Sequence, residues 1–487
     1  MLVPRTSPFL LLATGRTWAH TRRALALRGF RARRCPELER YEGTKKVIYI
    51  QGSGWEVRKG SSYVHLSRVD LFIAMGYADT RILPKTTGIR GAVIRVPAIV
   101  LASGLNGLCT VRSLGVTGVP VFAVVSGPSS PCARSRYARV FMREPGEPLL
   151  NTLGRLRRDH GVTHGVLMAT SDGETRELAE AMDQLPQGMH FAGPSSATVA
   201  LLMDKRTEIE TISRVSDLLP RSLAEIPDSP AAVLCALALP IIFKPRTQQM
   251  ADQLGMKNVV VSTPEALSAF LERFGRSLDL FVAQEVIPGE DDTIWQCNAV
   301  FNQKHALVSA FTFQKLGMSP PHFGVTTMGR SLRNDEVIAR ARRIGEALGY
   351  VGPAGMEFKR DPRDGCYRYI ETNPRHGMTN WFDTSCGVNS ALRAYQLALG
   401  DEEAVHPLQD EERVFIDLHA DLVSRLVDDA EPWTSVLRRY LSLMTVSRVP
   451  AYWWWRDPLP GLAALARNCG RSASRFVGAL RRRLIHG

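Results

Sequence analysis

The chain has 487 residues, of which 45% are hydrophobic and 22% are charged. These values exclude a disordered or collagen-like chain and suit two or three globular units. The longest apolar run, residues 231–243, includes Pro240 and is too short to span a bilayer, which excludes a polytopic membrane protein.

The net charge of +13 is concentrated at the two ends of the chain. Residues 1–36 contain eight Arg and no acid, and residues 450–487 contain seven Arg and one Asp, so the sequence between them is nearly neutral. A duplex-binding protein needs basic residues on its folded core. Nucleic acid is therefore not the expected partner, and binding by the two tails alone is the remaining alternative of that kind.

The eight Cys are scattered, with no CxxC pair. This pattern argues against a zinc ribbon and against a disulfide scaffold, and it favours a reducing, cytoplasmic setting. Residues 1–95 form a poorly defined basic extension. Its first 36 residues have the Arg-rich, acid-poor composition of a transit peptide, and an over-long gene start explains them equally well.

Regular structure is predicted from Val96 onward. Apolar, β-branched runs at 96–104, 119–127 and 164–172 alternate with a helical pattern at 107–118. Strands that alternate with helices predict a parallel, doubly wound, Rossmann-like sheet over 96–194. The segment SGLNG at 103–107 departs from the GxGxxG fingerprint, so a tight turn that lets the helix pack is the favoured interpretation.

From residue 195 the pattern changes to α+β. Residues 195–213 predict one capped helix, and a further helix precedes a short strand at Pro240–Lys244. Two antiparallel hairpins follow, separated by an amphipathic helix near 334–350. The second hairpin turns at Asp364–Gly365.

The second hairpin carries the most informative group of side chains. Glu357 lies on its first strand, and Glu371, Asn373 and Arg375 alternate along its second strand. Side chains at i and i+2 project from the same face of a strand. Two carboxylates and an amide oxygen suit Mg²⁺ that also binds phosphate, and Arg375 suits a phosphate or a carboxylate. A solvated, salt-bridged hairpin is the alternative.

Two lysines stand out because Lys is scarce, with ten among the 61 basic residues. Lys205 lies near a predicted helix start, and Lys244 ends an apolar strand before Pro245. A compact ammonium group suits a nucleotide phosphate. Surface lysines are the alternative for both positions.

Five motifs in order resemble the ATP-grasp superfamily, and in particular its carbamoyl-phosphate-synthase-like and carboxylate–amine ligase members. They are MDK (203–205), IIFKP (241–245), QEVIPGEDD (284–292), GMEFKRD (355–361) and YIETNPRHG (369–377). The resemblance covers about 96–400. It implies a Rossmann-like pre-ATP-grasp domain followed by a two-lobed ATP-grasp domain, with a nucleotide lobe at about 195–290 and a metal-binding, catalytic lobe at about 291–400.

The resemblance also implies roles for individual residues. ATP phosphates would be held by Lys205 and Lys244, and adenine by the hinge formed by Gln284, Glu285, Val286 and Ile287, with Asp292 near the ribose. Two Mg²⁺ ions, with Mn²⁺ as an alternative, would be bound by Glu357, Glu371 and Asn373. The catalytic cations would be Arg375, Lys315 and Arg330, the last two lying with His322 along the acceptor site.

The implied reaction is phosphoryl transfer from ATP to a carboxylate, followed by attack of an amine on the acyl-phosphate. The partners would be a small carboxylate and a small amine, for example an amino acid and a cell-envelope precursor. A bicarbonate-phosphorylating enzyme and an idle nucleotide-binding protein are the alternatives. One departure concerns the lid over the phosphates, because the segment from Lys244 to Lys257 contains only Gly255 where relatives often have a Gly-rich loop.

The C-terminal part is expected to be a helical extension (401–449) and a Trp-rich, basic, amphipathic tail (450–487). Trp453, Trp454 and Trp455 precede a stripe of apolar residues at helical spacing that begins at Leu462 and Leu465. Such a tail suits peripheral contact with the inner face of a membrane. Packing of the stripe on the body, or on a second subunit in a homodimer, is the alternative.

Overall fold

The computed structural model describes residues 96–467 except 216, 257, 323, 403–408, 410–411 and 444–445, together with the backbone of four short strands before residue 67. The chain divides into two compact units, Met1–Gly91 and Ala92–Gly487. In the first unit, β1 (Phe9–Ala13) pairs with β2 (Lys46–Ile50) and β3 (Trp55–Lys59) pairs with β4 (Ser62–Leu66), both antiparallel. The rest of the predicted N-terminal extension lies outside the described residues.

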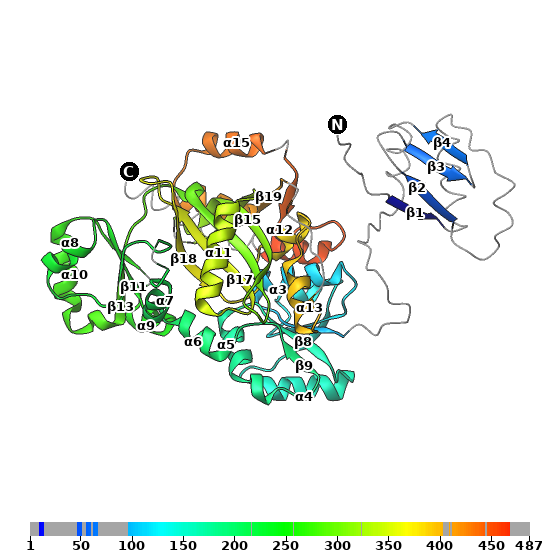
Figure 1. Ribbon diagram of the computed structural model, residues 1–487, viewed down its shortest axis with the longest axis horizontal. Helices are drawn as coiled ribbons and strands as arrows, with labels where there is room; N and C mark the ends of the chain where they lie inside the picture. Colours follow the sequence, from blue (N-terminus) through cyan, green and yellow to red (C-terminus); the bar gives the residue numbers. More distant parts are fainter. Residues whose placement is uncertain are drawn as a thin grey trace. The chain divides into compact units, whose positions relative to one another are not determined.

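The second unit begins with a five-stranded parallel sheet, as predicted for 96–194 (Figure 1). Its strand order is β7-β6-β5-β8-β9, which places the first strand of the domain in the middle, as in doubly wound folds. The strands are β5 (Ala98–Leu101), β6 (Val121–Val125), β7 (Arg139–Met142), β8 (Gly165–Ala169) and β9 (Met189–Phe191). The helices are α3 (Gly104–Gly115), α4 (Leu149–His160) and α5 (Asp172–Glu180).

Close packing explains the glycines where α3 begins. Gly104 has φ +52°, and a Cβ on Gly107 would lie 2.7 Å from the backbone of Ala102. A larger residue at Gly107 would therefore push the helix away from the strand that precedes it. This confirms the interpretation of 103–107 as a turn that allows helix packing.

The predicted single helix over 195–213 is wrong, because two helices occupy this segment. The first, α6 (Ser196–Met203), ends where Asp204 adopts an extended conformation and caps α7 (Lys205–Ile212) by accepting a hydrogen bond from the Arg206 amide. Asp204 also forms an ion pair with Arg246. The break makes Lys205 the first residue of a new helix, facing the nucleotide lobe.

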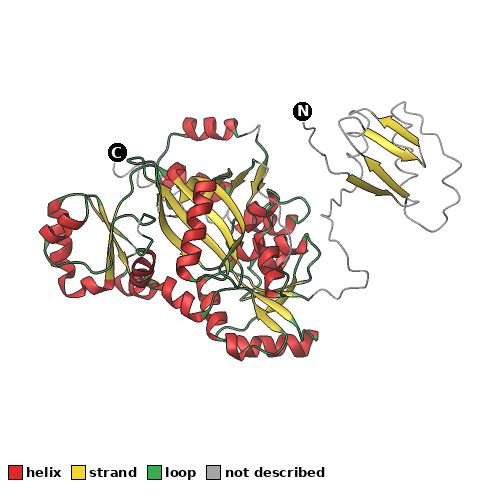
Figure 2. Cartoon of the chain, viewed as in Figure 1, coloured by secondary structure: helices red, strands yellow, loops and turns green. Residues whose placement is uncertain are grey.

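The predicted nucleotide lobe is a small antiparallel sheet with helices beside it (Figure 2). Its strand order is β10-β13-β11-β12, and an aromatic core forms beneath it, with the rings of Phe243 and Phe270 stacked at 4.0 Å. The strands are β10 (Ser222–Leu223), β11 (Ile241–Pro245), β12 (Val259–Val261) and β13 (Phe281–Glu285). The helices are α8 (Pro230–Ala236), α9 (Gln248–Leu254) and α10 (Pro264–Phe274).

A seven-stranded sheet forms the centre of the second unit, in the order β18-β17-β14-β15-β16-β19-β20. The two predicted hairpins supply four of its strands. The strands are β14 (Ile294–Phe301), β15 (Leu307–Ser319), β16 (Val325–Ser331), β17 (Gly352–Arg360), β18 (Tyr367–Asn373), β19 (Val414–Ile416) and β20 (Arg448–Pro450). The predicted mixture of a parallel α/β sheet and antiparallel α+β sheets is confirmed.

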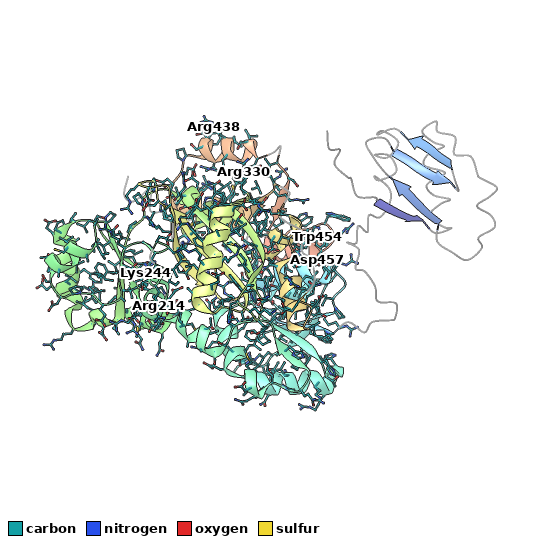
Figure 3. The ribbon with its side chains drawn as sticks, viewed as in Figure 1. Arg214, Lys244, Arg330, Arg438, Trp454 and Asp457 are labelled. Carbon is teal, nitrogen blue, oxygen red and sulfur yellow. The ribbon has the colours of Figure 1, made fainter. Side chains whose placement is uncertain are left out.

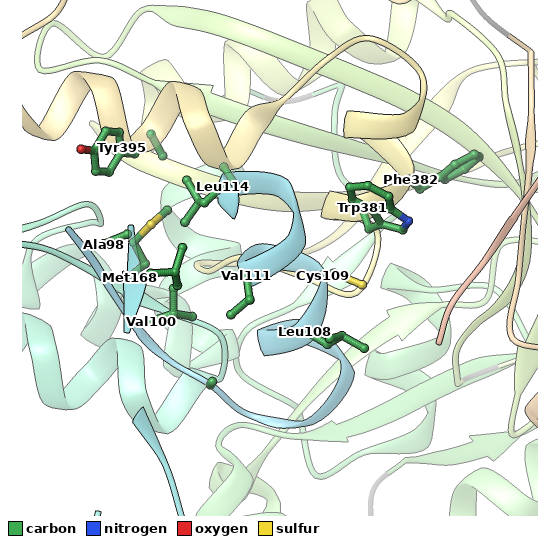
Figure 4. Close-up of a cluster of buried hydrophobic side chains, with 14 of the residues drawn as sticks. Ala98, Val100, Leu108, Cys109, Val111, Leu114, Met168, Trp381, Phe382 and Tyr395 are labelled. Carbon is green, nitrogen blue, oxygen red and sulfur yellow. The ribbon is translucent and has the colours of Figure 1, made fainter. Parts of the chain in front are cut away.

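The two faces of this sheet pack against different elements. One face is covered by α11 (Asp335–Leu348), whose Val337, Ala341 and Ile344 are fully buried. The other face packs on α12 (Asn380–Ser385) and α13 (Ser390–Ala398). Figure 4 shows how Trp381 and Phe382 of α12 continue the buried cluster of α3 and β5. The N-terminal domain and the central sheet therefore share one hydrophobic core.

The segment after residue 400 is less helical than expected. Its described part contains α14 (Leu418–Val423), a π-helical turn at Ser424–Asp428 and α15 (Trp433–Ser442), but also β19, which pairs with β16 in the central sheet. The run Val414–Ile416 is short, apolar and fully buried, which suits a strand rather than a helix. Among the described helices, none has both the length and the apolar character that crossing a membrane requires.

The first part of the Trp-rich tail packs on the N-terminal domain. Trp454 stacks on Tyr137 with ring centroids 5.5 Å apart and lies 4.6 Å from Trp381, while Trp453 and Trp455 are exposed. Trp454 and Asp457 lie near each other in Figure 3. Residues 458–467 are helical, and their Leu462 and Leu465 are exposed. The described part of the predicted stripe therefore faces away from the body, and the rest lies outside the described residues.

Candidate functional site

Two adjoining cavities lie where the nucleotide lobe, the central sheet and the N-terminal domain meet. The first is lined by the two lysines Lys205 and Lys244 and by the hinge, and the second by Arg375 and several amide side chains. Glu357 and Glu371 line both cavities. The predicted metal-binding residues therefore stand at the boundary between two spaces that could hold two different molecules.

The pairing of β17 with β18 explains how the predicted metal-binding residues converge. Glu357 lies directly opposite Glu371, and Asn373 lies opposite Gly355. The amide of Asn373 donates a hydrogen bond of 3.2 Å to Glu371 Oε1. Cross-strand partners project from the same face, so two carboxylates and one amide meet in one place. This donor set fits Mg²⁺ that completes its shell with phosphate oxygens and water.

Lys315 on β15 contacts the carboxylate of Glu357. Its Nζ lies 2.7 Å from Glu357 Oε2, and the side chain is 1% exposed. Burial raises the pKa of the Glu357 carboxyl, and the ammonium of Lys315 opposes that shift. Lys315 therefore supplies a fixed positive charge next to the carboxylates, where phosphate oxygens would also gather.

The polar groups of the first cavity, where phosphates are predicted to bind, contact one another. Lys244 Nζ donates a 2.7 Å hydrogen bond to Gln284 Oε1, and burial lowers the pKa of Lys244. Glu208, on α7 with Lys205, accepts a hydrogen bond from the hydroxyl of Tyr369. Burial raises the pKa of Glu208 to about 7, which the hydrogen bond from Tyr369 opposes.

The hinge residues Gln284–Ile287 all line the first cavity, but their polar groups are not equally available. The carboxylate of Glu285 accepts a 2.9 Å hydrogen bond from the Ala238 amide and faces Arg363. The amide of Val286 donates to the Pro240 carbonyl at 2.9 Å. Adenine recognition at this hinge would therefore fall to other backbone groups and to the apolar side chains of Val286 and Ile287.

Arg375 lines the second cavity and is held from two sides. Its Nε lies 2.8 Å from Asp172 Oδ1 of the N-terminal domain, and its Nη2 lies 3.0 Å from Asn373 Oδ1. The guanidinium thus connects the N-terminal domain with the hairpin formed by β17 and β18.

The structure does not bring Asp292 or Arg330 to either cavity. Asp292 is exposed, and its backbone carbonyl accepts a hydrogen bond from Gln314. Arg330 forms an ion pair with Glu412, and Figure 3 shows it in a different part of the molecule from Lys244. His322, in contrast, lines the first cavity, with Nδ1 3.1 Å from Asp291 Oδ1.

The segment after Lys244, which departs from the Gly-rich loop of the family, contains the helix α9. Thr247 caps α9, and Gly255 ends it with φ +63°. Lys257 lies outside the described residues. In its described part, this segment therefore forms a helix with a single glycine at its end.

Sequence reasoning missed several side chains that line the cavities. Glu208, Tyr369 and Lys359 line the first cavity, and Gln296 and Asn298 line the second. Glu208 follows Lys205 by three residues, so the two share one side of α7. That spacing was visible in the sequence, whereas the placement of β14 beside β17, which brings Gln296 next to Glu357, was not.

Comparisons with known proteins agree with this architecture, although no family model matches the chain. A 140-residue stretch is 28% identical to D-aspartate ligase of Enterococcus faecium, which is 28% of this chain and 33% of that protein. The chain thus matches about a third of the length of this curated relative.

Two solved structures resemble the chain at 14% identity. One is the biotin carboxylase domain of Hydrogenobacter thermophilus 2-oxoglutarate carboxylase, with a TM-score of 0.51 over 66% of this chain and 73% of that one. The other is N5-carboxyaminoimidazole synthetase of Staphylococcus aureus, with a TM-score of 0.50 over 69% and 85%. At this identity the likeness establishes the fold.

Proposed function

We propose that this chain, which has the fold of the ATP-grasp superfamily, is an ATP- and Mg²⁺-dependent ligase that joins a carboxylate to an amine through an acyl-phosphate. The observation that carries the proposal is the pair of cavities that meet at Glu357 and Glu371. One cavity offers lysines for a triphosphate, and the other offers Arg375 for a carboxylate. Phosphoryl transfer between two bound molecules requires this arrangement.

The residues of the first cavity would bind and orient ATP. Lys205 and Lys244 would hold the α- and β-phosphates, and Gln284 through Ile287 would border adenine. Glu357, Glu371 and Asn373 would hold two magnesium ions, which when bound offset the charge of the phosphate oxygens. Asn373 Oδ1 accepts a hydrogen bond from Arg375, which leaves one lone pair of this oxygen for a metal ion.

The residues of the second cavity would hold the carboxylate and stabilise the charge that develops on it. Arg375 would bind the carboxylate and later the acyl-phosphate, and Lys315 would keep a positive charge below the reacting group. Fixed cations in a site that excludes water are the main way enzymes stabilise such transition states. Lys315 lies on β15, and Arg375 lies two residues after the end of β18 in the same sheet.

The carboxylate is proposed to be an amino acid, because the stretch of sequence identity is to D-aspartate ligase. The same stretch favours this carboxylate over bicarbonate as the phosphate acceptor. A cell-envelope or polysaccharide precursor is the proposed source of the amine. Arg330 and Asp292 are left out of this proposal because neither lines a cavity.

A phosphate-release screen tests the proposal. Purified protein, ATP and Mg²⁺ are combined with a matrix of carboxylates, D-aspartate first, and amines. We expect release that depends on one carboxylate–amine pair and is lost in Glu371→Gln, with circular dichroism unchanged. Phosphate release that persists in Glu371→Gln contradicts the metal assignment, and no release with any pair contradicts the ligase.

A cytoplasmic setting with peripheral contact at the inner membrane face is proposed with this function. Exposed Trp453, Trp455, Leu462 and Leu465, near Arg467, support it. Flotation with anionic liposomes tests it in the variant Leu462→Glu/Leu465→Glu, which leaves the packed Trp454 intact. Equal flotation of this variant and the parent contradicts membrane contact.

Sedimentation without lipid tests the proposed homodimer.

A further inference from the structure

A row of three polar side chains leads from the shared core to the metal-binding residues. Asp383 lies on α12, and Asn298 and Gln296 lie two residues apart on the same face of β14. Asn298 and Gln296 line the second cavity, whereas Asp383 is fully buried behind them. The hydrogen bonds along this row fix the orientation of each amide.

Asp383 sets the direction of the row. Three groups donate hydrogen bonds to its Oδ2, namely the hydroxyl of Ser390 and the amides of Asn298 at 3.1 Å and Asn380 at 3.2 Å. Thr384 donates to Oδ1 at 3.2 Å. An oxygen that receives three donors acts as an acceptor. Asn298 must therefore turn its NH₂ group toward Asp383 and its carbonyl away from it.

The orientation is passed on to Gln296. Asn298 Oδ1 accepts hydrogen bonds from Gln296 Nε2 at 2.9 Å and from Thr379 Oγ1 at 3.1 Å. Because the NH₂ group of Gln296 is held by Asn298, its carbonyl oxygen points the other way. Within the described part of the chain, no group donates a hydrogen bond to Gln296 Oε1.

Gln296 stands beside the place where the reactants would meet. It lies directly opposite Glu357 in the pairing of β14 with β17. A Cβ on Gly355 would lie 3.3 Å from Gln296 Nε2, so the glycine leaves room for the amide. Glu371 and Arg375 line the same cavity. An oriented, unpartnered carbonyl therefore faces the acceptor cavity next to the metal-binding pair.

We propose that Gln296 Oε1 accepts a hydrogen bond from the N–H of the attacking amine and so positions the amine for attack on the acyl-phosphate. This inference rests on the ligase function proposed above. A carbonyl oxygen attracts N–H donors and repels a carboxylate, whereas Arg375 does the opposite. The two reactants thus have separate places in one cavity.

The chemistry of the attack explains why a neutral acceptor is suitable. The nitrogen lone pair forms the C–N bond, the C–O bond to the phosphate breaks, and the phosphate leaves with that electron pair and takes the proton that the nitrogen loses. The nitrogen must be uncharged to attack. A carboxylate in place of Gln296 would favour the ammonium form, whereas an amide carbonyl binds the free amine. The substrate class is therefore an amine with at least one N–H, delivered as the free base.

The experiment separates amine binding from acyl-phosphate formation. Hydroxylamine serves as the amine probe, with the carboxylate that the phosphate-release screen identifies. Positional isotope exchange in ATP, measured without amine, reports acyl-phosphate formation alone. The variant Gln296→Met removes the hydrogen-bond acceptor and keeps a side chain of similar size. If this variant does not fold, Gln296→Leu is used in its place. Gln314→Met is the matched control, since Gln314 lies on the next strand and points away from the cavity.

We expect Gln296→Met to raise the KM for hydroxylamine about ten-fold, as loss of one hydrogen bond predicts, with isotope exchange within about two-fold of the parent. Gln314→Met should change neither. An unchanged KM, or a KM and an exchange rate that change together, overturns the role of Gln296. Absence of isotope exchange in the parent with every carboxylate would instead overturn the ligase function itself.

Discussion

Lys315 and Glu357 form a 2.7 Å ion pair beneath the metal-binding hairpin, and the lysine is 1% exposed. The two residues come from β15 and β17, which are separated in the sheet by β14. The pair therefore spans the strand that carries Gln296. A buried charge without its partner is strongly unfavourable, so removing either residue alone should destabilise the fold.

Lys315→Met should lower the free energy of unfolding by about 3 kcal/mol, because it leaves the Glu357 carboxylate buried and unpaired. The double variant Lys315→Met/Glu357→Gln should regain much of this loss, since no unpaired charge remains. Urea unfolding at pH 8 measures both. A double variant that is less stable than Lys315→Met would show that the ion pair is not the cause.

Arg112 and Asp457 should hold the Trp-rich segment on the N-terminal domain. Arg112 Nε lies 3.0 Å from Asp457 Oδ2, both side chains are almost fully buried, and Ser135 also donates to Asp457. Arg112→Met should lower the free energy of unfolding by about 3 kcal/mol and expose the segment to trypsin. Arg136→Met is the control, because its guanidinium is near the surface. Equal stability of the two variants would contradict this role.

Local patterns in the sequence were sufficient for most of the fold. Alternating strands and helices predicted the parallel sheet, and the spacing of Glu357, Glu371 and Asn373 predicted their convergence, because residues in one hairpin are neighbours in sequence and in space. Asp204 was the local exception. An aspartate at this position can either continue the helix or cap a new one. The contact of Asp204 with Arg246, 42 positions away, favours the cap.

Contacts between distant segments could not be predicted in this way. Arg330 is paired with Glu412 because β19 adds to the edge of the central sheet, and Arg112 lies 345 positions from Asp457. The partners of Trp454 could not be predicted for the same reason, since they lie in the N-terminal domain and in α12. A motif identifies residue types, and only the topology determines which cavity they line.

Glu208 should make stability depend on pH. Its pKa is raised to about 7 from an ordinary value of 4.5, chiefly by burial. Between these values the unfolded chain has lost the proton while the folded chain keeps it, so stability falls as pH rises from 4.5 to 7. The loss should be about 3 kcal/mol relative to Glu208→Gln, which has no such proton. Urea unfolding of the parent and of Glu208→Gln at pH 5 and pH 8 measures this loss. A difference in stability between the two proteins that is the same at both pH values would contradict the prediction.

Gly317 should be required where the C-terminal helices meet β15. A Cβ at this position would lie 2.5 Å from Arg425 Nη2 and 2.6 Å from Asp421 Oδ1. Those two atoms cannot easily move, because Asp421 is fully buried and accepts hydrogen bonds from Thr327 at 2.7 Å and from Arg425 at 2.8 Å. The network therefore cannot take up the added methyl group without losing a buried hydrogen bond.

Gly317→Ala should accordingly lower the free energy of unfolding by about 2 kcal/mol, as overpacking of a buried site does. Gly127→Ala is the control, since nothing lies within 4 Å of the added Cβ there. Because Arg425 also donates to the Leu316 carbonyl and Ser424 to the Met318 carbonyl, the same variant should shift the end of β15, which borders both cavities. A raised KM for the carboxylate in Gly317→Ala, with the control unchanged, would show that the C-terminal helices position the acceptor cavity. Equal stability and equal KM in the two variants would contradict this role of the helices.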